Sequence, residues 1–207
     1  MKKEKKKRQI GDTTFCRYKK IMRKSKGEHN MEKALEIVGN GSSEGVRNYH
    51  TQMEAAKKGI ITEQMKVVAK KEYRTEEEIR NLVAKGQVVI CANRQHKCLE
   101  PNGVGSMLRT KINVNLGVSR DCKDYDIEME KVMAAVNMGA EAIMDLSSHG
   151  DTQPFRRKLT SECPAMIGTV PIYDSVIHYQ RDLATLTAKD FIDVIRLHAE
   201  DGVDFVT

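Results

Sequence analysis

The sequence has no long apolar stretch. Nothing in its 207 residues approaches the 18 consecutive apolar residues of a membrane-spanning helix, so we expect none. The basic first residues are not followed by an apolar core segment, so the N-terminus does not match a secretory signal. With 40% hydrophobic and 31% charged residues, the chain has the composition of a globular protein, and we expect it in the cytoplasm.

Cysteine pairs with the spacing of metal ligands are also missing. The five cysteines are Cys16, Cys91, Cys98, Cys122 and Cys163, and no two of them form a Cys-x-x-Cys pair. Their odd number argues against a disulfide framework. We therefore expect small buried thiols, and no metal or cluster site made by this chain alone.

A glycine-rich phosphate loop is absent as well. No Gly-x-Gly-x-x-Gly pattern follows a predicted strand. The segment GNGSS at 39–43 follows a predicted helix and has no Lys-Ser or Lys-Thr after it. The sequence therefore does not predict a nucleotide-binding loop.

Positive charge is concentrated at the N-terminal end. Residues 1–26 contain twelve Lys or Arg and two acidic residues, so the rest of the chain carries about −4 although the whole carries +6. We expect 1–30 to be a disordered, solvated basic tail. A nucleic-acid-binding tail is the alternative, but no aromatic or glycine-rich recognition pattern lies among the basic residues.

Helical patterns with clear start signals precede residue 87. Thr62 is a predicted N-cap, and Thr75 opens the capping box TEEE of a helix that stops before Gly86. The predicted helices cover 31–38, 48–58, 62–71 and 75–85. We therefore assign 31–86 to a helical N-terminal extension.

Strands and helices alternate after residue 87. The patterns predict strands at 88–91, 111–116, 142–146, 166–170 and 204–207, and helices at 127–138, 152–161, 175–183 and 188–199. This alternation predicts an α/β fold with a parallel sheet, and we expect 87–207 to be the first half of a TIM-type (β/α) barrel, truncated within a strand. An open doubly wound sheet is the alternative.

Motifs along residues 51–207 carry a resemblance to a known family. They are GIITEQM at 59–65, LEP at 99–101 with GVG at 103–105, KINVNLG at 111–117, MDLS at 144–147, GTVPIY at 168–173 and DGVDFVT at 201–207. Their order and spacing resemble the N-terminal part of the ThiC family of radical enzymes. Each motif alone is modest, and the ordered set is specific.

The resemblance implies a β/α barrel and radical S-adenosylmethionine chemistry. In the intact family a [4Fe–4S] cluster and S-adenosylmethionine serve to rearrange aminoimidazole ribotide into hydroxymethylpyrimidine phosphate for thiamine. A further metal site and a homodimer also belong to the intact family. The family's cluster cysteines and metal ligands lie beyond the part resembled, so we expect none of these cofactors to be fully liganded here and the chain to be inactive alone.

The resemblance also implies substrate-binding residues. Asn115 matches an asparagine whose amide can donate and accept hydrogen bonds, Met144 would be an apolar wall, and Tyr173 would bind phosphate or ribose. Asn93 and Asn113 complete the predicted set, and no catalytic or metal-binding residue is predicted. A buried core role for Met144 and a strand-end role for Tyr173 are the alternatives from the residues themselves.

One loop departs from the family pattern. Cys91 replaces a usual proline, and Arg94 and Gln95 replace other residues of a loop expected at the barrel rim. This departure leaves open a paralogue, 5-hydroxybenzimidazole synthase of cobalamin lower-ligand synthesis, which uses the same substrate. A non-catalytic fragment that pairs with a separate C-terminal half is an alternative of another class.

Overall fold

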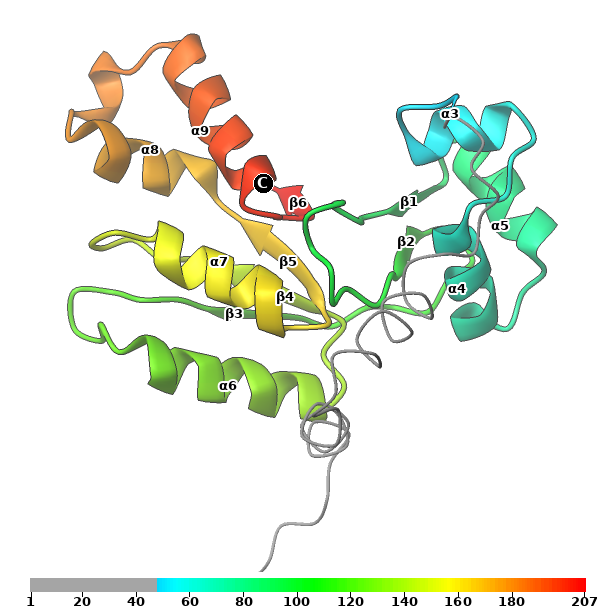
Figure 1. The fold of residues 1–207 in the computed structure, drawn as a ribbon, viewed down its shortest axis with the longest axis horizontal. Helices are drawn as coiled ribbons and strands as arrows, with labels where there is room; N and C mark the ends of the chain where they lie inside the picture. Colours follow the sequence, from blue (N-terminus) through cyan, green and yellow to red (C-terminus); the bar gives the residue numbers. More distant parts are fainter. Residues whose placement is uncertain (1–47) are drawn as a thin grey trace, which may run out of the picture. The chain divides into compact units, whose positions relative to one another are not determined.

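The structure is a computed structural model that describes residues 48–207. The predicted basic tail at 1–30 and the predicted helix at 31–38 lie outside the described residues. In the described part, mixed helices and strands follow one another in the order shown in Figure 1. None of the helices in this part is long and apolar enough to cross a membrane.

Three short helices open the described chain: α3 (Gln52–Lys57), α4 (Glu63–Glu72) and α5 (Glu76–Ala84). The predicted caps are confirmed, because the Thr62 side chain accepts from the Met65 N–H and Thr75 forms a reciprocal capping box with Glu78. These helices bury a first apolar cluster, which consists of Ala56, Met65, Val68, Ala69, Ile79, Val83, Val88 and Ile90.

The strand predicted at 88–91 exists but does not join the parallel sheet. It is β1 (Val88–Ile90), which pairs antiparallel with β2 (Gly103–Gly105), a strand the sequence did not predict. Val88 and Ile90 are buried in the helical cluster, which explains where the strand docks. A methyl group on Gly103 would lie 2.8 Å from Val68 Cγ1, so this position of β2 requires a residue without a side chain.

The four remaining predicted strands form one parallel sheet in the order β3-β4-β5-β6. The strands are β3 (Asn113–Leu116), β4 (Ala142–Asp145), β5 (Met166–Thr169) and β6 (Phe205–Val206). The helices between them are α6 (Tyr125–Asn137), α7 (Gln153–Glu162), α8 (Pro171–Tyr179) and α9 (Ala188–Glu200), with a short 3₁₀ turn at Leu183–Thr185. The described residues therefore form an open α/β sheet, and no closed barrel is formed by these four strands.

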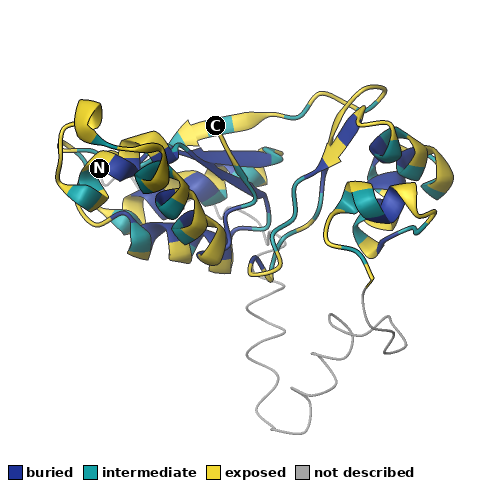
Figure 2. Cartoon of the chain, turned by 90° about the horizontal axis from the view of Figure 1, so that it is seen from above, coloured by how far each residue is buried: buried dark blue, intermediate teal, exposed yellow. Residues whose placement is uncertain are grey.

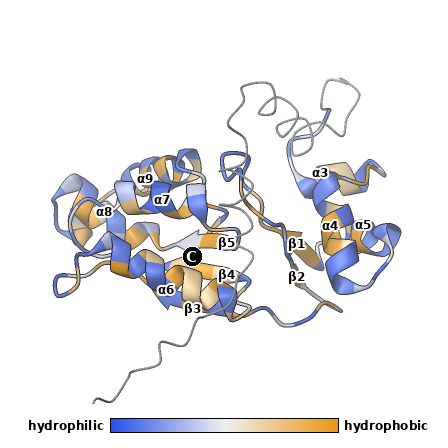
Figure 3. Ribbon diagram, turned by 60° about the horizontal axis from the view of Figure 1, so that its bottom comes forward, coloured by the Kyte–Doolittle hydropathy of each residue, from blue (hydrophilic) through white to orange (hydrophobic). Residues whose placement is uncertain are grey.

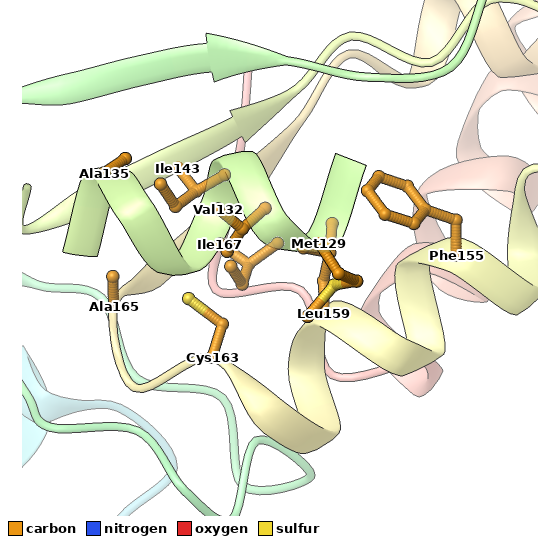
Figure 4. Packing of buried hydrophobic residues seen from close by; sticks show 9 residues of the cluster. All are labelled: Met129, Val132, Ala135, Ile143, Phe155, Leu159, Cys163, Ala165 and Ile167. Atoms are coloured by element: carbon orange, nitrogen blue, oxygen red, sulfur yellow. The ribbon is translucent and has the colours of Figure 1, made fainter. Parts of the chain in front are cut away.

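One face of this sheet packs on helices. Its core joins α6, β4, α7 and β5 through nine buried residues: Met129, Val132, Ala135, Ile143, Phe155, Leu159, Cys163, Ala165 and Ile167 (Figure 4). Val114 and Leu116 of β3 pack against the same cluster. The strands β4 and β5 are buried, and Figure 2 shows dark blue strands beside helices whose outer surfaces are yellow. In Figure 3, β4 is orange, while much of α7 is blue or white. We call this side of the sheet the helix face.

A buried histidine ties the loop after β1 to the sheet. His96 Nδ1 lies 2.7 Å from Asp204 Oδ2, and His96 Nε2 lies 2.7 Å from the Cys163 carbonyl oxygen. Both partners are acceptors, so both ring nitrogens must donate and the imidazole is protonated. Burial acts to lower its pKa, but the bond to Asp204 and its charge outweigh burial and raise the pKa to about 10.

The core of the helix face predicts a large cost for truncating Leu159. Leu159→Ala would leave a cavity among fully buried side chains, and we expect it to lower the unfolding free energy by about 2–5 kcal/mol. Ser161→Ala, on the exposed side of the same helix, should change it by less than about 0.5 kcal/mol. Urea denaturation followed by circular dichroism measures both, and equal effects would contradict the packing described.

The His96 ion pair predicts a specific pH dependence. The folded pKa of about 10 exceeds the usual 6.5, so the stabilisation is complete below pH 6.5 and is lost as the pH rises towards 10. His96→Gln should cost about 3–5 kcal/mol at pH 6, because it leaves the Asp204 carboxylate buried without its charged partner. The difference between the wild type and this variant should shrink between pH 6.5 and 10. His149→Gln is the control, and a difference independent of pH would refute the protonated ring.

Candidate functional site

The second face of the sheet carries the predicted asparagines. Successive residues of a strand point to opposite faces. Val114 and Leu116 pack into the helix face, so Asn113 and Asn115 point to the other side, where both are exposed. On this second face lie Asn113, Asn115, Ala142, Met144, Met166, Gly168 and Phe205.

Asn115 and Met144 are in-register neighbours on β3 and β4. Met144 is only 7% exposed, whereas Asn115 is open to solvent. The same row continues to Gly168 on β5 and Phe205 on β6. The second face therefore presents a polar amide at one end of the row and apolar groups along the rest of it.

The carboxyl ends of β3 and β4 are held together by their loops. The Ser147 hydroxyl accepts from the Val118 N–H at 3.1 Å, and Ser147 donates both its N–H and its hydroxyl to Asp145 Oδ1. A methyl group on Gly117 would lie 2.5 Å from the Ser147 nitrogen, and Gly117 has φ +145°. This close approach requires glycine at 117. It fixes the carboxyl ends of β3 and β4, the strands that carry Asn115 and Met144.

Tyr173 lies in the first turn of α8, directly after β5. It is 49% exposed, and the turn begins with Pro171 without a side-chain cap. Its neighbour Asp174 anchors the turn: Asp174 accepts from Thr152 Oγ1 at 2.5 Å and from His198 Nε2 at 2.9 Å. Tyr173 is thereby placed at the same sheet edge as the carboxyl ends of β4 and β5.

Asp174 belongs to a buried polar network behind that edge. Arg156 joins Asp174 at 3.2 Å to Asp201 at 3.0 Å, and His198 Nδ1 lies 2.8 Å from Thr169 Oγ1. Burial acts to raise the pKa of Asp174, but the bonds from His198 and Thr152 and the charge of Arg156 lower it to about 2. The charged groups of this network are paired with one another. Their bonds to Asp174 fix the first turn of α8.

A cavity of about 690 Å³ lies beside this network, between the loop after β4, α7 and α8. Arg156 and Asp174 reach its wall, but both are already bonded to each other and to the network. The other side chains that line it include His149, Gln153 and His178. No residue of β3 lines this cavity.

Asn93 does not lie on the second face with the other predicted asparagines. Its side-chain amide donates to the carbonyls of Ala199 and Val203, and its N–H donates to Asp204 Oδ1. These partners precede β6, so the loop lies at the amino ends of the strands. In the described residues the polar groups of Asn93 bind the turn that enters β6, and a substrate contact by Asn93 stays a prediction.

The described cysteines do not fit a cluster or a metal. No group of three or more His, Cys, Asp or Glu in residues 48–207 is arranged to hold a metal ion. Burial raises the pKa of Cys91 and raises that of Cys163 to about 12, which keeps these thiols protonated. The described chain therefore offers no ligand set for an iron–sulfur cluster.

Phe205 and the Asp174 network were not predicted from sequence as parts of the site. Gly168 and Phe205 face each other only through the register of β5 with β6. Asp174 and His198 lie 24 residues apart and meet through packing. The sequence offers one signal, the glycine in the middle of a strand, which often marks a close approach by another group.

Comparisons with known proteins agree with the motifs. Residues 51–207 match the radical SAM ThiC family. Phosphomethylpyrimidine synthase of Alkaliphilus oremlandii is 60% identical over 159 residues, which cover 77% of this chain and 36% of that protein. The enzymes of the same name from Clostridioides difficile and Clostridium novyi are each 58% identical over 160 residues, 77% of this chain and 37% of each relative. The chain thus spans little more than a third of these relatives, and it belongs to the radical SAM ThiC family.

Proposed function

We propose that this chain is the substrate-binding part of a phosphomethylpyrimidine synthase and that its second sheet face binds aminoimidazole ribotide. The observation that supports this most is the row on β3 and β4, where exposed Asn115 stands in register with buried Met144. A planar, polar heterocycle needs an apolar surface beside a group that both donates and accepts hydrogen bonds. The relatives carry the name of the synthase that fits this substrate.

Asn115 is the polar anchor in this proposal. Its carboxamide offers two N–H donors and one carbonyl acceptor, which suits the ring nitrogens or a ribose hydroxyl. The residue is exposed on the strand, so the amide can exchange water for a ligand. Asn113, two residues earlier on the same face, would extend the polar end of the site.

Tyr173 is the proposed contact for the ribose or phosphate. Tyr173 lies in the first turn of α8, directly after β5, which supports a contact at the carboxyl ends of the strands. Its neighbour Asp174 is held by three polar partners, which limits the freedom of the first turn of α8. A backbone that is already fixed loses less entropy when a residue on it binds a ligand. Asn93 stays in the proposal only as a residue that shapes the entry to β6.

The parallel sheet also supports a proposal for the whole fold. One face covered by helices and one face without that core are what a segment of a β/α barrel presents. Residues 87–207 would be the first part of such a barrel, 31–86 a helical extension and 1–30 a basic tail. The intact protein would be a cytoplasmic homodimer.

The radical chemistry would come from elsewhere in the family polypeptide. In intact members a [4Fe–4S] cluster and S-adenosylmethionine supply the radical. The described residues hold no ligand set for them, so this chain's own residues bind and orient the substrate. Turnover would need the remaining part of the polypeptide, on the same or a separate chain.

The paralogous product, 5-hydroxybenzimidazole, is the second candidate, and the names of the relatives favour the thiamine pyrimidine over it. The departures from the family pattern lie in the loop of Asn93 and His96, which binds the amino ends of the strands. The polar groups of Asn93 and His96 are bonded to the turn that enters β6 and to the Cys163 carbonyl, which favours a structural role for them. We therefore favour the thiamine pyrimidine.

Asn115→Ala tests the site directly. We expect it to weaken binding of aminoimidazole ribotide by about tenfold, because it removes the hydrogen-bonding amide. Titration calorimetry on the chain measures the affinity. Asn137→Ala, at the end of α6 on the helix side, is the matched control and should bind as the wild type does. If the wild type and Asn115→Ala bind with equal affinity, the binding site does not include Asn115 on β3.

Anaerobic reconstitution tests the assignment of cofactors. Incubation of the chain with iron and sulfide is expected to give no [4Fe–4S] absorbance, because within residues 48–207 no three His, Cys, Asp or Glu side chains are grouped to hold a metal. An intact relative treated in the same way is the positive control. Cluster absorbance on this chain would show that it carries more than the substrate site.

A further inference from the structure

Gly168 leaves room on the second face for an aromatic ring. A methyl group added to Gly168 would lie 2.4 Å from Cε2 and Cζ of Phe205, closer than any real contact. Gly168 and Phe205 are in-register neighbours on β5 and β6. The ring of Phe205 therefore occupies the space in which every other residue at 168 would place its side chain.

The ring belongs to the second face. Ile167 packs in the core of the helix face, so the direction of a side chain on Gly168 is towards the opposite side. Phe205 is half-buried and is not a member of that core. Met144 is the neighbour of Gly168 on its other side. Phe205 and Met144 thus flank a strand position without a side chain.

We propose that Phe205 is a substrate-binding residue whose ring, together with Met144, forms the surface against which the planar heterocycle of the substrate stacks. This inference rests on the proposed function. Aromatic faces bind flat rings in offset stacks, and a thioether beside them is polarizable and adaptable. Asn115, at the far end of the same row, would bond the edge of the stacked ring. The row thus selects ligands by their heterocycle, while Tyr173 contacts the ribose phosphate.

The prediction separates two parts of one ligand. Aminoimidazole ribotide has both the heterocycle and the ribose phosphate, whereas ribose 5-phosphate lacks the heterocycle. Phe205→Leu keeps an apolar residue but removes the aromatic face, and should weaken binding of aminoimidazole ribotide by about tenfold. It should change the binding of ribose 5-phosphate by less than about twofold, a difference that lost folding alone would not produce.

Two further variants complete the experiment. Gly168→Ala keeps the ring but forces it to move, and should weaken aminoimidazole ribotide selectively, as Phe205→Leu does. Val206→Ala, the next residue on β6 and on the other face, should leave both affinities unchanged. Titration calorimetry on the full chain measures all affinities, and circular dichroism confirms that each variant is folded.

The outcomes distinguish this inference from the proposed function. If the wild type does not bind aminoimidazole ribotide, the proposed function fails and the inference fails with it. If the wild type binds but Phe205→Leu and Gly168→Ala bind equally well, only the stacking role is overturned. An equal loss for both ligands would also overturn it, because Phe205 would then support the strand and not the heterocycle.

Discussion

The Asp204 carboxylate joins three segments of the described chain that are distant in sequence. One oxygen accepts from the Asn93 N–H, and the other accepts from His96 and from the Ile167 N–H. A single side chain thus joins the loop after β1, the start of β5 and the entry to β6. The charge of protonated His96 compensates the carboxylate, so the joint avoids the cost of an unpaired buried anion. The placement of β6, and hence of Phe205, depends on this joint.

The two faces of the parallel sheet have separate tasks. Alternate residues of each strand supply the packed core on the helix side, and this core fixes the strands. The residues between them are not members of that core: Asn113 and Asn115 are exposed, whereas Ala142, Met144 and Met166 are buried. Asn115 shows the result, because an exposed asparagine in a strand contributes little to stability. The polar network around Asp174 and His198 supports the edge where both faces end.

Features that depend on neighbouring residues, such as helix caps, could be predicted from the sequence. Features that depend on packing between distant segments could not. The caps at Thr62 and Thr75 involve residues three positions apart, so the pattern alone places these helices. The strand β2 consists of Gly103, Val104 and Gly105, which show no strand pattern. It forms because Gly103 fits against Val68 of the helix α4. The asparagine row could be predicted from alternation and family motifs, whereas the contact of Phe205 with Gly168 required the register of β6.

The order β3-β4-β5-β6 has a consequence for how the chain behaves in solution. Within residues 48–207, the outer sides of β3 and β6 pair with no further strand. Backbone N–H and carbonyl groups along such edges can bond to any extended segment that reaches them. The edge of β3 presents four residues. An extended segment of a second copy that paired along β3 would lie beside Asn113 and Asn115, and would compete with the ligand proposed for them.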